Sequence, residues 1–465
     1  MRPFITAFRF EFRRGVREGV LPALLLLFAV AVVYAAWNGR TWRENQKAAR
    51  EAALRDTAKF RDEVLARYAS ILERTPEKAP NTGMLMVSVW YRPTIPVAPL
   101  AAVTVGQGEG YPFDLRFHPS NTRAIFAARP ITIGNPEARA VGRFDLAFVV
   151  VVVLPLLLLA VVFDVWAAER ESGVARLLQA QPVAPGLLLG AKLLARGGSA
   201  LLGFTGILAA ASAWTALPDT SLTGVLPEMA LITLIVLSYG AFWLLLARAI
   251  NMVAASSSQA ALAAGATWLA VVALIPAGLS TVRDLLQPAP SWPAQTSALR
   301  SAEVALERRQ KERAAARGPA SSIDRNALVL KSLVESAEDQ QLLADAQASA
   351  RQQQDKRRQW ADTYRFAAPS LLVQDALERI AGTDAARANA FSDQALDFIV
   401  TLRDLIQQHL RDGKKAASVR EYAEIIPQFT FEEATVGERF GPVLINFASL
   451  CGFSAVTWLV FRPKF

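Results

Sequence analysis

The residues that suggest chemistry in this sequence are charged, and they lie in a short segment between two long apolar runs. Glu169, Arg170 and Glu171 follow directly on the apolar run 146–163. After Gly173, an apolar strip at helical spacing leads to two prolines that end the helix: Val174, Leu177, Leu178, Pro182 and Pro185. Such an amphipathic helix, neither transmembrane nor free in solution, needs a surface to dock against. The alternative is that Arg170 and Arg176 merely hold a loop on the cytoplasmic side.

Catalytic motifs are missing from the sequence. A phosphate-binding loop needs a glycine five residues before a Gly-Lys-Ser/Thr. The Gly-Lys pair at 413–414 lacks the upstream glycine and the following Ser or Thr, and the run 186–192 (GLLLGAK) has the wrong spacing. The two histidines, His118 and His409, lie in different parts of the chain, and there is no G-x-S-x-G motif. We therefore predict no catalytic residue, no metal site and no ATP hydrolysis by this chain.

The composition indicates a membrane protein with large water-exposed parts. The chain has 465 residues, of which 52% are hydrophobic and 20% charged. Its net charge of +9 could suit nucleic acid, but much of the basicity lies next to apolar spans, so we expect no nucleic-acid partner. Cys451 is the single cysteine, which excludes an intrachain disulfide.

We expect an α-helical membrane protein with six transmembrane helices in a lipid bilayer. Phe4, Phe8, Phe12 and Val16 share a helical face opposite several arginines, which predicts an interfacial helix before the first span. The predicted segments are 1–39 for this helix and span one, 144–168, 193–217, 229–247, 259–281 and 440–461 for spans two to six, and 169–192 for a cytoplasmic loop.

The distribution of basic residues predicts that both termini are cytoplasmic. Arginines crowd the N-terminal helix, Arg248 closes span four, and Arg462 and Lys464 follow span six, whereas the loop 218–228 has no Lys or Arg. Two large segments would then lie outside: insert 1 (40–143) and insert 2 (284–438).

The two inserts differ in predicted structure. Insert 1 begins with a helical pattern to about residue 75 and continues, over 84–134, with short β-prone runs separated by prolines and glycines, so we predict a small α+β part. Insert 2 is predicted to be all α. A coiled-coil seam is predicted from spacing of four and three at Ile323, Ala327, Leu330, Val334, Ala337, Gln341, Ala344 and Ala348.

The segment 169–196, ERESGVARLLQAQPVAPGLLLGAKLLAR, resembles the loop between spans two and three of ABC-2 type transporter permeases. An E-R-E-x-G start, a Q-P-V and a later G-K pair are typical there; here that pair reads Ala191-Lys192. The six-span plan and interfacial helix also fit, so the resemblance covers about half of the chain. The big inserts resemble a bacterial subgroup that carries a domain of unknown function.

The resemblance implies a partner for the loop. In that family the loop carries a coupling helix that enters a groove of a separate ABC ATPase subunit, so ATP would be bound by the partner and this chain would need no cofactor. The residues placed at that contact are Glu169, Arg170, Glu171, Gly173, Arg176 and Leu177. A second permease, identical or similar, would complete a dimer in the bacterial plasma (inner) membrane.

The sequence therefore predicts a permease subunit of an ABC-2 exporter whose substrate is not specified. The alternative is a membrane scaffold that transports nothing and gathers partners through an extracytoplasmic coiled coil, since the inserts are large.

Overall fold

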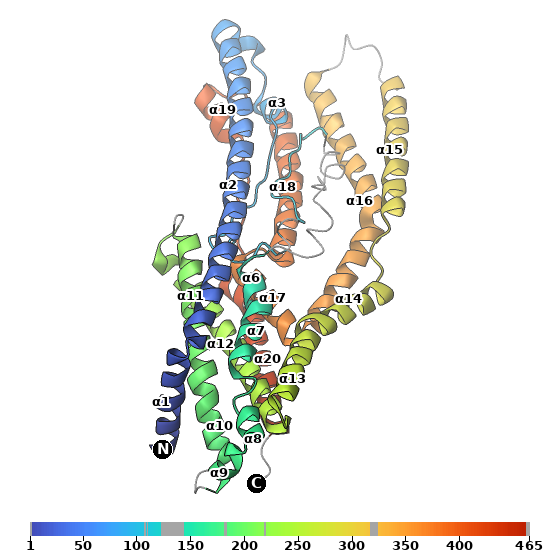
Figure 1. The fold of residues 1–465 in the computed structure, drawn as a ribbon. Coiled ribbons are helices and arrows are strands. Elements are labelled where there is room, and N and C mark those ends of the chain that lie inside the picture. The colour runs from blue at the N-terminus through green and yellow to red at the C-terminus, as the bar shows by residue number, and fades with distance from the viewer. Residues whose placement is uncertain are drawn as a thin grey trace.

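The computed structural model describes residues 2–106, 108, 110–121, 144–180, 184–217, 220–316 and 324–461. Six of its helical segments are long and apolar enough to cross a membrane, which confirms an α-helical, multi-pass membrane protein. They are Val20–Arg74, Leu146–Glu171, Pro185–Ala216, Leu222–Val253, Ser257–Leu286 and Val436–Val460. Figure 1 shows both ends of the chain at one end of this bundle, called here the near end, and the inserts at the opposite, far end.

The chain enters through two helices joined at a glycine. Helix α1 (Arg2–Arg17) ends before Gly19, whose φ of 77° turns the backbone into α2 (Val20–Arg74). Helix α2 runs unbroken for 55 residues, so span one and the predicted stalk are a single rod of roughly 80 Å. Beyond Gly39 it contains no proline or glycine, and pairs such as Arg40–Glu44 support it along its exposed side.

The second span has a π-helical turn, η2 (Val149–Val153), between α6 (Leu146–Phe148) and α7 (Leu154–Val162). Pro155 has no N–H that could donate to the Val151 carbonyl. The hydroxyl of Tyr239 in α12 (Leu222–Val253) donates to this carbonyl instead, at 3.1 Å. The indole of Trp268, in α13 (Ser257–Leu269), serves the next carbonyl, Val152, at 3.1 Å. The region around Pro155 is thus a hydrogen-bonded junction of three spans.

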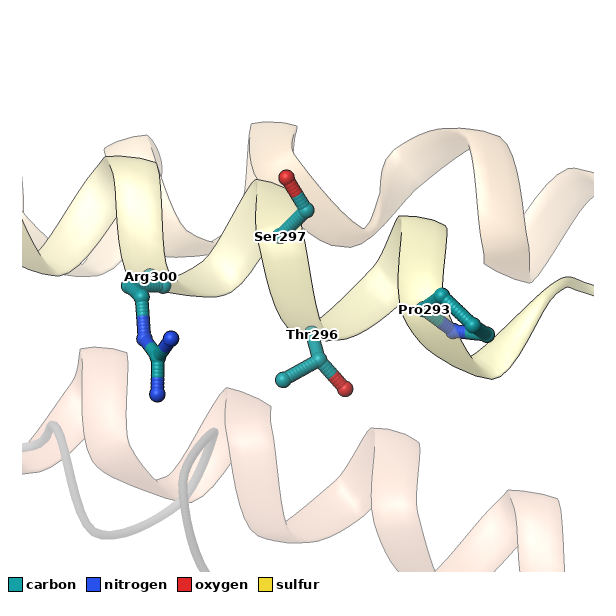
Figure 2. A pocket seen from close by; sticks show the side chains of 4 residues that line it. All are labelled: Pro293, Thr296, Ser297 and Arg300. Carbon is teal, nitrogen blue, oxygen red and sulfur yellow. The ribbon is translucent and has the colours of Figure 1, made fainter.

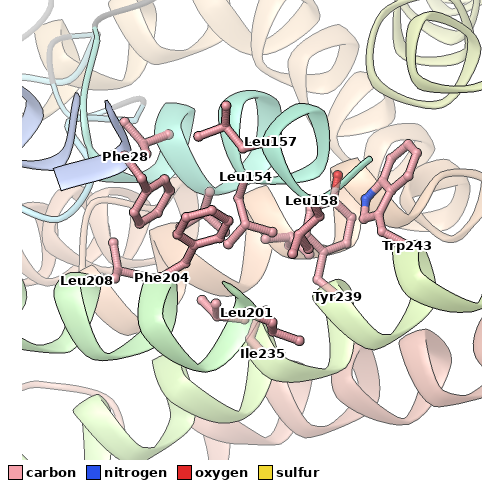
Figure 3. Packing of buried hydrophobic residues seen from close by; sticks show 14 of the residues in the cluster. Phe28, Leu154, Leu157, Leu158, Leu201, Phe204, Leu208, Ile235, Tyr239 and Trp243 are labelled. Carbon is pink, nitrogen blue, oxygen red and sulfur yellow. The ribbon is translucent and has the colours of Figure 1, made fainter. Parts of the chain in front are cut away.

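Apolar side chains from four spans meet in the middle of the bundle. Figure 3 shows Phe28 of α2 against Phe204 of α11 (Ser199–Ala216), and Leu154 and Leu158 of α7 beside Tyr239 of α12. The rings of Phe28 and Phe204 have centroids 4.4 Å apart, and both side chains are fully buried. This packing fixes spans one to four relative to one another and so positions the loop between spans two and three.

Insert 1 differs from the prediction. Its described residues 84–121 hold the end of a short helix, α3 (Thr82–Val87), and isolated bridges, Tyr91 with Phe117, Thr94 with Asp114 and His118 with Asn121, but no strand. The predicted α+β part is therefore wrong for this region. Prolines repeat in RPTIPVAP and remove the N–H groups that a strand ladder needs. The β-prone run 128–133 lies outside the described residues.

Insert 2 is mostly helical over its described residues, with short connections between the helices. Helices α15 (Trp292–Ala315) and α16 (Arg325–Tyr364) pack as a hairpin, while α18 (Ala385–Asp412) packs on α3 and α19 (Val419–Ile425) on α2. The predicted seam of α16 is wrong in register, since Val334 is 48% exposed. The buried positions are Leu333, Ser336, Asp339, Leu343 and Ala350. Leu333 and Leu343 lie on the buried face, and so does Asp339, which pairs with Arg313 of α15 at 3.0 Å.

One helix of insert 2 packs into the membrane bundle. Helix α17 (Pro369–Ala381) buries Leu372, Val373, Ala376, Leu377 and Ile380 in the same core as the spans and packs against α12 and α20 (Val436–Val460). Asn446 of α20 donates to its Leu372 carbonyl at 3.2 Å. The far end of the bundle is thus built partly from the insert.

Candidate functional site

The segment after span two forms two short helices at the near end of the bundle (Figure 1). Helix α8 (Ala167–Glu171) follows a turn at 163–166, and α9 (Val174–Gln179) follows Gly173. Gly173 has a φ of 78°, a left-handed conformation that glycine adopts at little cost, so it sets the angle between the two helices. Residues 181–183, the Q-P-V part of the motif, lie outside the described residues.

Glu169 belongs to a buried ionic cluster rather than to an open surface. Its carboxylate pairs with Lys192 at the end of α10 (Pro185–Leu193). Lys192 Nζ also lies 3.0 Å from Glu11 Oε1 of α1, and Arg196 lies 2.8 Å from Glu11 Oε2. Glu11 is only 2% exposed. The cluster thus joins α1, the loop and the start of span three.

The electrostatics of the cluster keep Glu11 charged. Burial alone raises the pKa of a carboxyl, but hydrogen bonds and charges from Lys192 and Arg196 outweigh it and lower the pKa of Glu11 below its ordinary value. The two acids and two bases are balanced, which is the condition under which buried charges are tolerated. Lys192 is itself only 9% exposed and pairs with both acids.

Arg170 and Glu171 attach the loop to the connection between spans four and five. The Arg170 guanidinium donates to the carbonyls of Met252, at 3.1 Å, and Ala254. These carbonyls lie at the C-terminus of α12, where a cation is favourable. Glu171 accepts from the backbone N–H of Ser257 at 2.9 Å, at the start of α13. Both side chains are therefore bound within the chain.

Asn251, near the end of α12, completes these internal contacts. It is fully buried, and its amide reaches the break between α7 and α8. Its Nδ2 donates to the Val162 carbonyl at 2.8 Å and its Oδ1 accepts from the Trp166 N–H, also at 2.8 Å. The amide thus joins α12 to the turn that leads into α8.

Helix α9 has the opposite character. Leu177 is 71% exposed and Val174 42%, and Arg176 is exposed beside them, while Ala175 packs inward. Large apolar side chains exposed next to an arginine are typical of a protein-binding surface. The six predicted residues therefore divide into an internal group, Glu169, Arg170 and Glu171, and a group around the outward face of α9, Gly173, Arg176 and Leu177.

The sequence analysis missed two residues that build this site. Glu11 is the one acid among the arginines of α1, and that contrast was the available signal. Asn251 is a polar residue at the end of an apolar span, where an amide needs partners. Neither partner could be found from one sequence, because both contacts join residues far apart in the chain.

No second candidate site for chemistry stands out among the described residues. No group of three or more His, Cys, Asp or Glu side chains there could hold a metal ion. The Thr82 hydroxyl and the Nδ1 of His409 form a hydrogen bond of 2.7 Å. A hollow of about 450 Å³ beside α15 is shown in Figure 2, lined by Pro293, Thr296, Ser297 and Arg300, which bring no carboxylate, thiol or imidazole.

The comparisons with known proteins concern insert 2. A family described as Domain of unknown function (DUF3526) matches residues 296–432, which hold most of α15 and all of α16 to α19. The match covers less than half of the chain and includes α17, the helix packed among the spans. No curated protein matches the chain.

Proposed function

We propose that this chain is the membrane-spanning permease subunit of an ABC-2 type exporter in the bacterial plasma membrane. In this proposal the near end faces the cytoplasm, and two permease chains, identical or similar, bind two copies of a separate ABC ATPase. ATP would be bound and hydrolysed by that partner. The inserts would lie on the far side of the membrane.

The observation that carries the proposal is that α9 is exposed to solvent while α8 is bound to other parts of the chain. The outward face of α9 offers exposed apolar groups and Arg176 to a partner, while the internal group ties α8 to three other parts of the chain. If the docking surface contacted no other part of the chain, an ATPase could bind it without transmitting its movement to the spans. Here a push on α9 would reach α1, span three, and spans four and five.

Two substitutions separate docking from transmission. The chain is co-purified with the ATPase encoded beside it, and ATP hydrolysis is measured in lipid nanodiscs. Leu177→Asp places a charge on the docking face, so association is expected to fall by tenfold or more, on the order of 1.4 kcal/mol. Arg170→Ala leaves that face intact, so the ATPase is expected to bind while its stimulation is lost.

The matched control is Val304→Asp, at an apolar side chain that is 54% exposed on α15. Helix α15 lies at the far end of the molecule (Figure 1). It should leave both association and stimulation unchanged. Unaltered association of Leu177→Asp would refute α9 as the docking face. Full stimulation in Arg170→Ala would refute the internal group as the transmission path.

The alternative, a scaffold that transports nothing, draws support from the hairpin of α15 and α16, which presents exposed apolar residues such as Val304 and Val334. A scaffold would form its complexes without any ATPase. Native mass spectrometry of the purified chain distinguishes the two: stable complexes that lack an ATPase favour the scaffold, and stoichiometric ATPase favours the exporter.

A further inference from the structure

The second span is broken at one place, between Val162 and Ala167, where the backbone forms a turn over residues 163–166. In an unbroken α-helix the Trp166 N–H would donate to the Val162 carbonyl. Here the side-chain amide of Asn251 lies between these two groups, donating to Val162 O at 2.8 Å and accepting from Trp166 N at 2.8 Å. The amide thus takes the place of one rung of the helical ladder.

The remaining capacity of this amide is also used. Its second N–H donates to the Ala247 carbonyl, at 3.0 Å within α12, and its oxygen also receives the Ala167 N–H at 3.4 Å. Both proton donors and both acceptor positions of Asn251 are therefore satisfied in a site closed to water. A side chain inserted into the ladder is a recognised cause of a helix kink.

The two backbone groups that the amide serves can also pair with each other. If the amide withdraws, the Trp166 N–H and the Val162 carbonyl can bond to each other, and span two becomes continuous with α8. These two backbone groups therefore have a hydrogen-bond partner in either state. The buried amide of Asn251 would lose its own partners on withdrawal, and this cost favours the open break. Two arrangements that differ by the movement of one side chain would form a two-state element.

We infer that Asn251 is a positioning residue that holds open a switchable kink in span two, and that closing the kink swings α8 and α9 relative to spans four and five. The contacts of Arg170 with the Met252 and Ala254 carbonyls and of Glu171 with Ser257 would change in the same movement. The kink itself requires no ATPase. Only its use in transport rests on the proposed function.

The test measures the kink in the purified full-length chain in nanodiscs without any partner. Spin labels are placed on Arg176→Cys of α9 and Leu262→Cys of α13, both exposed, in a Cys451→Ser background. Asn251→Ala removes the inserted amide and is expected to shift the main distance between the labels by roughly 5 Å. A change of about 20° in a kink produces that displacement over about 15 Å, the length of some ten helical residues.

Two further variants guard against loss of folding. Asn251→Asp has the shape of the amide but presents an acceptor where Val162 and Ala247 need a donor, so it should shift the same distance. Asn446→Ala removes another fully buried amide, at the far end of the bundle, and should leave the distance unchanged. The unsubstituted chain should itself show a minor population at the shifted distance.

An unshifted distance in folded Asn251→Ala or Asn251→Asp would overturn the inference, as would a single narrow distance in the unsubstituted chain if neither variant folds. A failure of the proposed function would be detected in a separate experiment. In the co-purification, the chain without spin labels would then bind no ATPase.

Discussion

Glu11 and Lys192 lie 3.0 Å apart although their positions in the sequence differ by 181, and their contact joins the first helix of the chain to the loop after span two. The Glu11 side chain is 2% exposed and the Lys192 side chain 11%. Charges buried to this extent are stable only while they are paired.

Loss of the Glu11 carboxylate is expected to destabilise the protein. Glu11→Ala leaves Lys192 and Arg196 facing each other with only Glu169 to compensate, and removing one partner of a buried pair costs about 3 kcal/mol. The thermal unfolding midpoint in detergent should fall accordingly. Arg14→Ala, which breaks the exposed pair Arg14–Glu18 on the same helix, should cost less than about 1 kcal/mol. Equal losses in the two variants would contradict the role given to burial.

The angle between α8 and α9 is expected to depend on Gly173. A Cβ there would meet nothing within 4 Å, so the cost of Gly173→Ala comes from the φ of 78° alone, about 1–2 kcal/mol. Hydrogen exchange at the backbone amides of 167–180 should become faster. Gly190→Ala in α10 also meets open space but has a helical backbone, so it should leave exchange in the loop unchanged or slower.

Stability should depend on pH through Glu378 of α17. Burial raises the pKa of Glu378 to about 7 against the hydrogen bond from Gln374, and the carboxylates of Asp375, Asp384 and Asp145 raise it further. Because the folded-state pKa lies above the ordinary 4.5, the folded protein binds the extra proton. This contribution is fully present below about pH 4.5 and is lost as pH rises through about 7.

Replacing Glu378 by glutamine should remove that dependence. At pH 8 Glu378→Gln should be more stable than the unsubstituted chain by up to about 3 kcal/mol, with little difference at pH 4.5. Unfolding midpoints measured from pH 4.5 to 8 give the two curves. Glu424→Gln, at an exposed ion pair with Arg420, is the control and should leave the curve unchanged. Parallel curves for Glu378→Gln and the unsubstituted chain would show that this carboxyl is not the titrating group.

The close approach of insert 1 to span one should make Gly39 intolerant of any side chain. A Cβ at Gly39 would lie 2.0 Å from the carbonyl oxygen of Ala102, a backbone atom that cannot rotate away. Gly39→Ala is expected to cost about 1–3 kcal/mol in unfolding free energy, as overpacking does. In contrast, Gly206→Ala in α11 meets nothing within 4 Å and should be neutral or stabilising. A neutral Gly39→Ala would mean that the Ala102 loop is free to move.

The sequence was sufficient to predict six spans and a charged loop at the near end, because apolar runs and helix-ending prolines are local signals. It was misleading where packing decides the outcome. The β-prone runs of insert 1 were read from residue type, yet the Pro93–Pro99 region removes the donors a sheet requires. The resemblance placed Glu169 and Arg170 at the contact with a partner. Their side chains bind Lys192 and the α12 carbonyls, residues too far away in the chain for one sequence to reveal the contacts.

The uninterrupted length of α2 has a mechanical consequence. The part beyond Gly39 projects for about 50 Å as the rigid continuation of a span, and α19 and α3 gather around its distal end. A tilt of span one by about 10°, well within the range of membrane helices, would carry that end sideways by roughly 9 Å. A small rotation of span one inside the bilayer would therefore displace the distal end of α2, at the tip of insert 1, by a much larger distance.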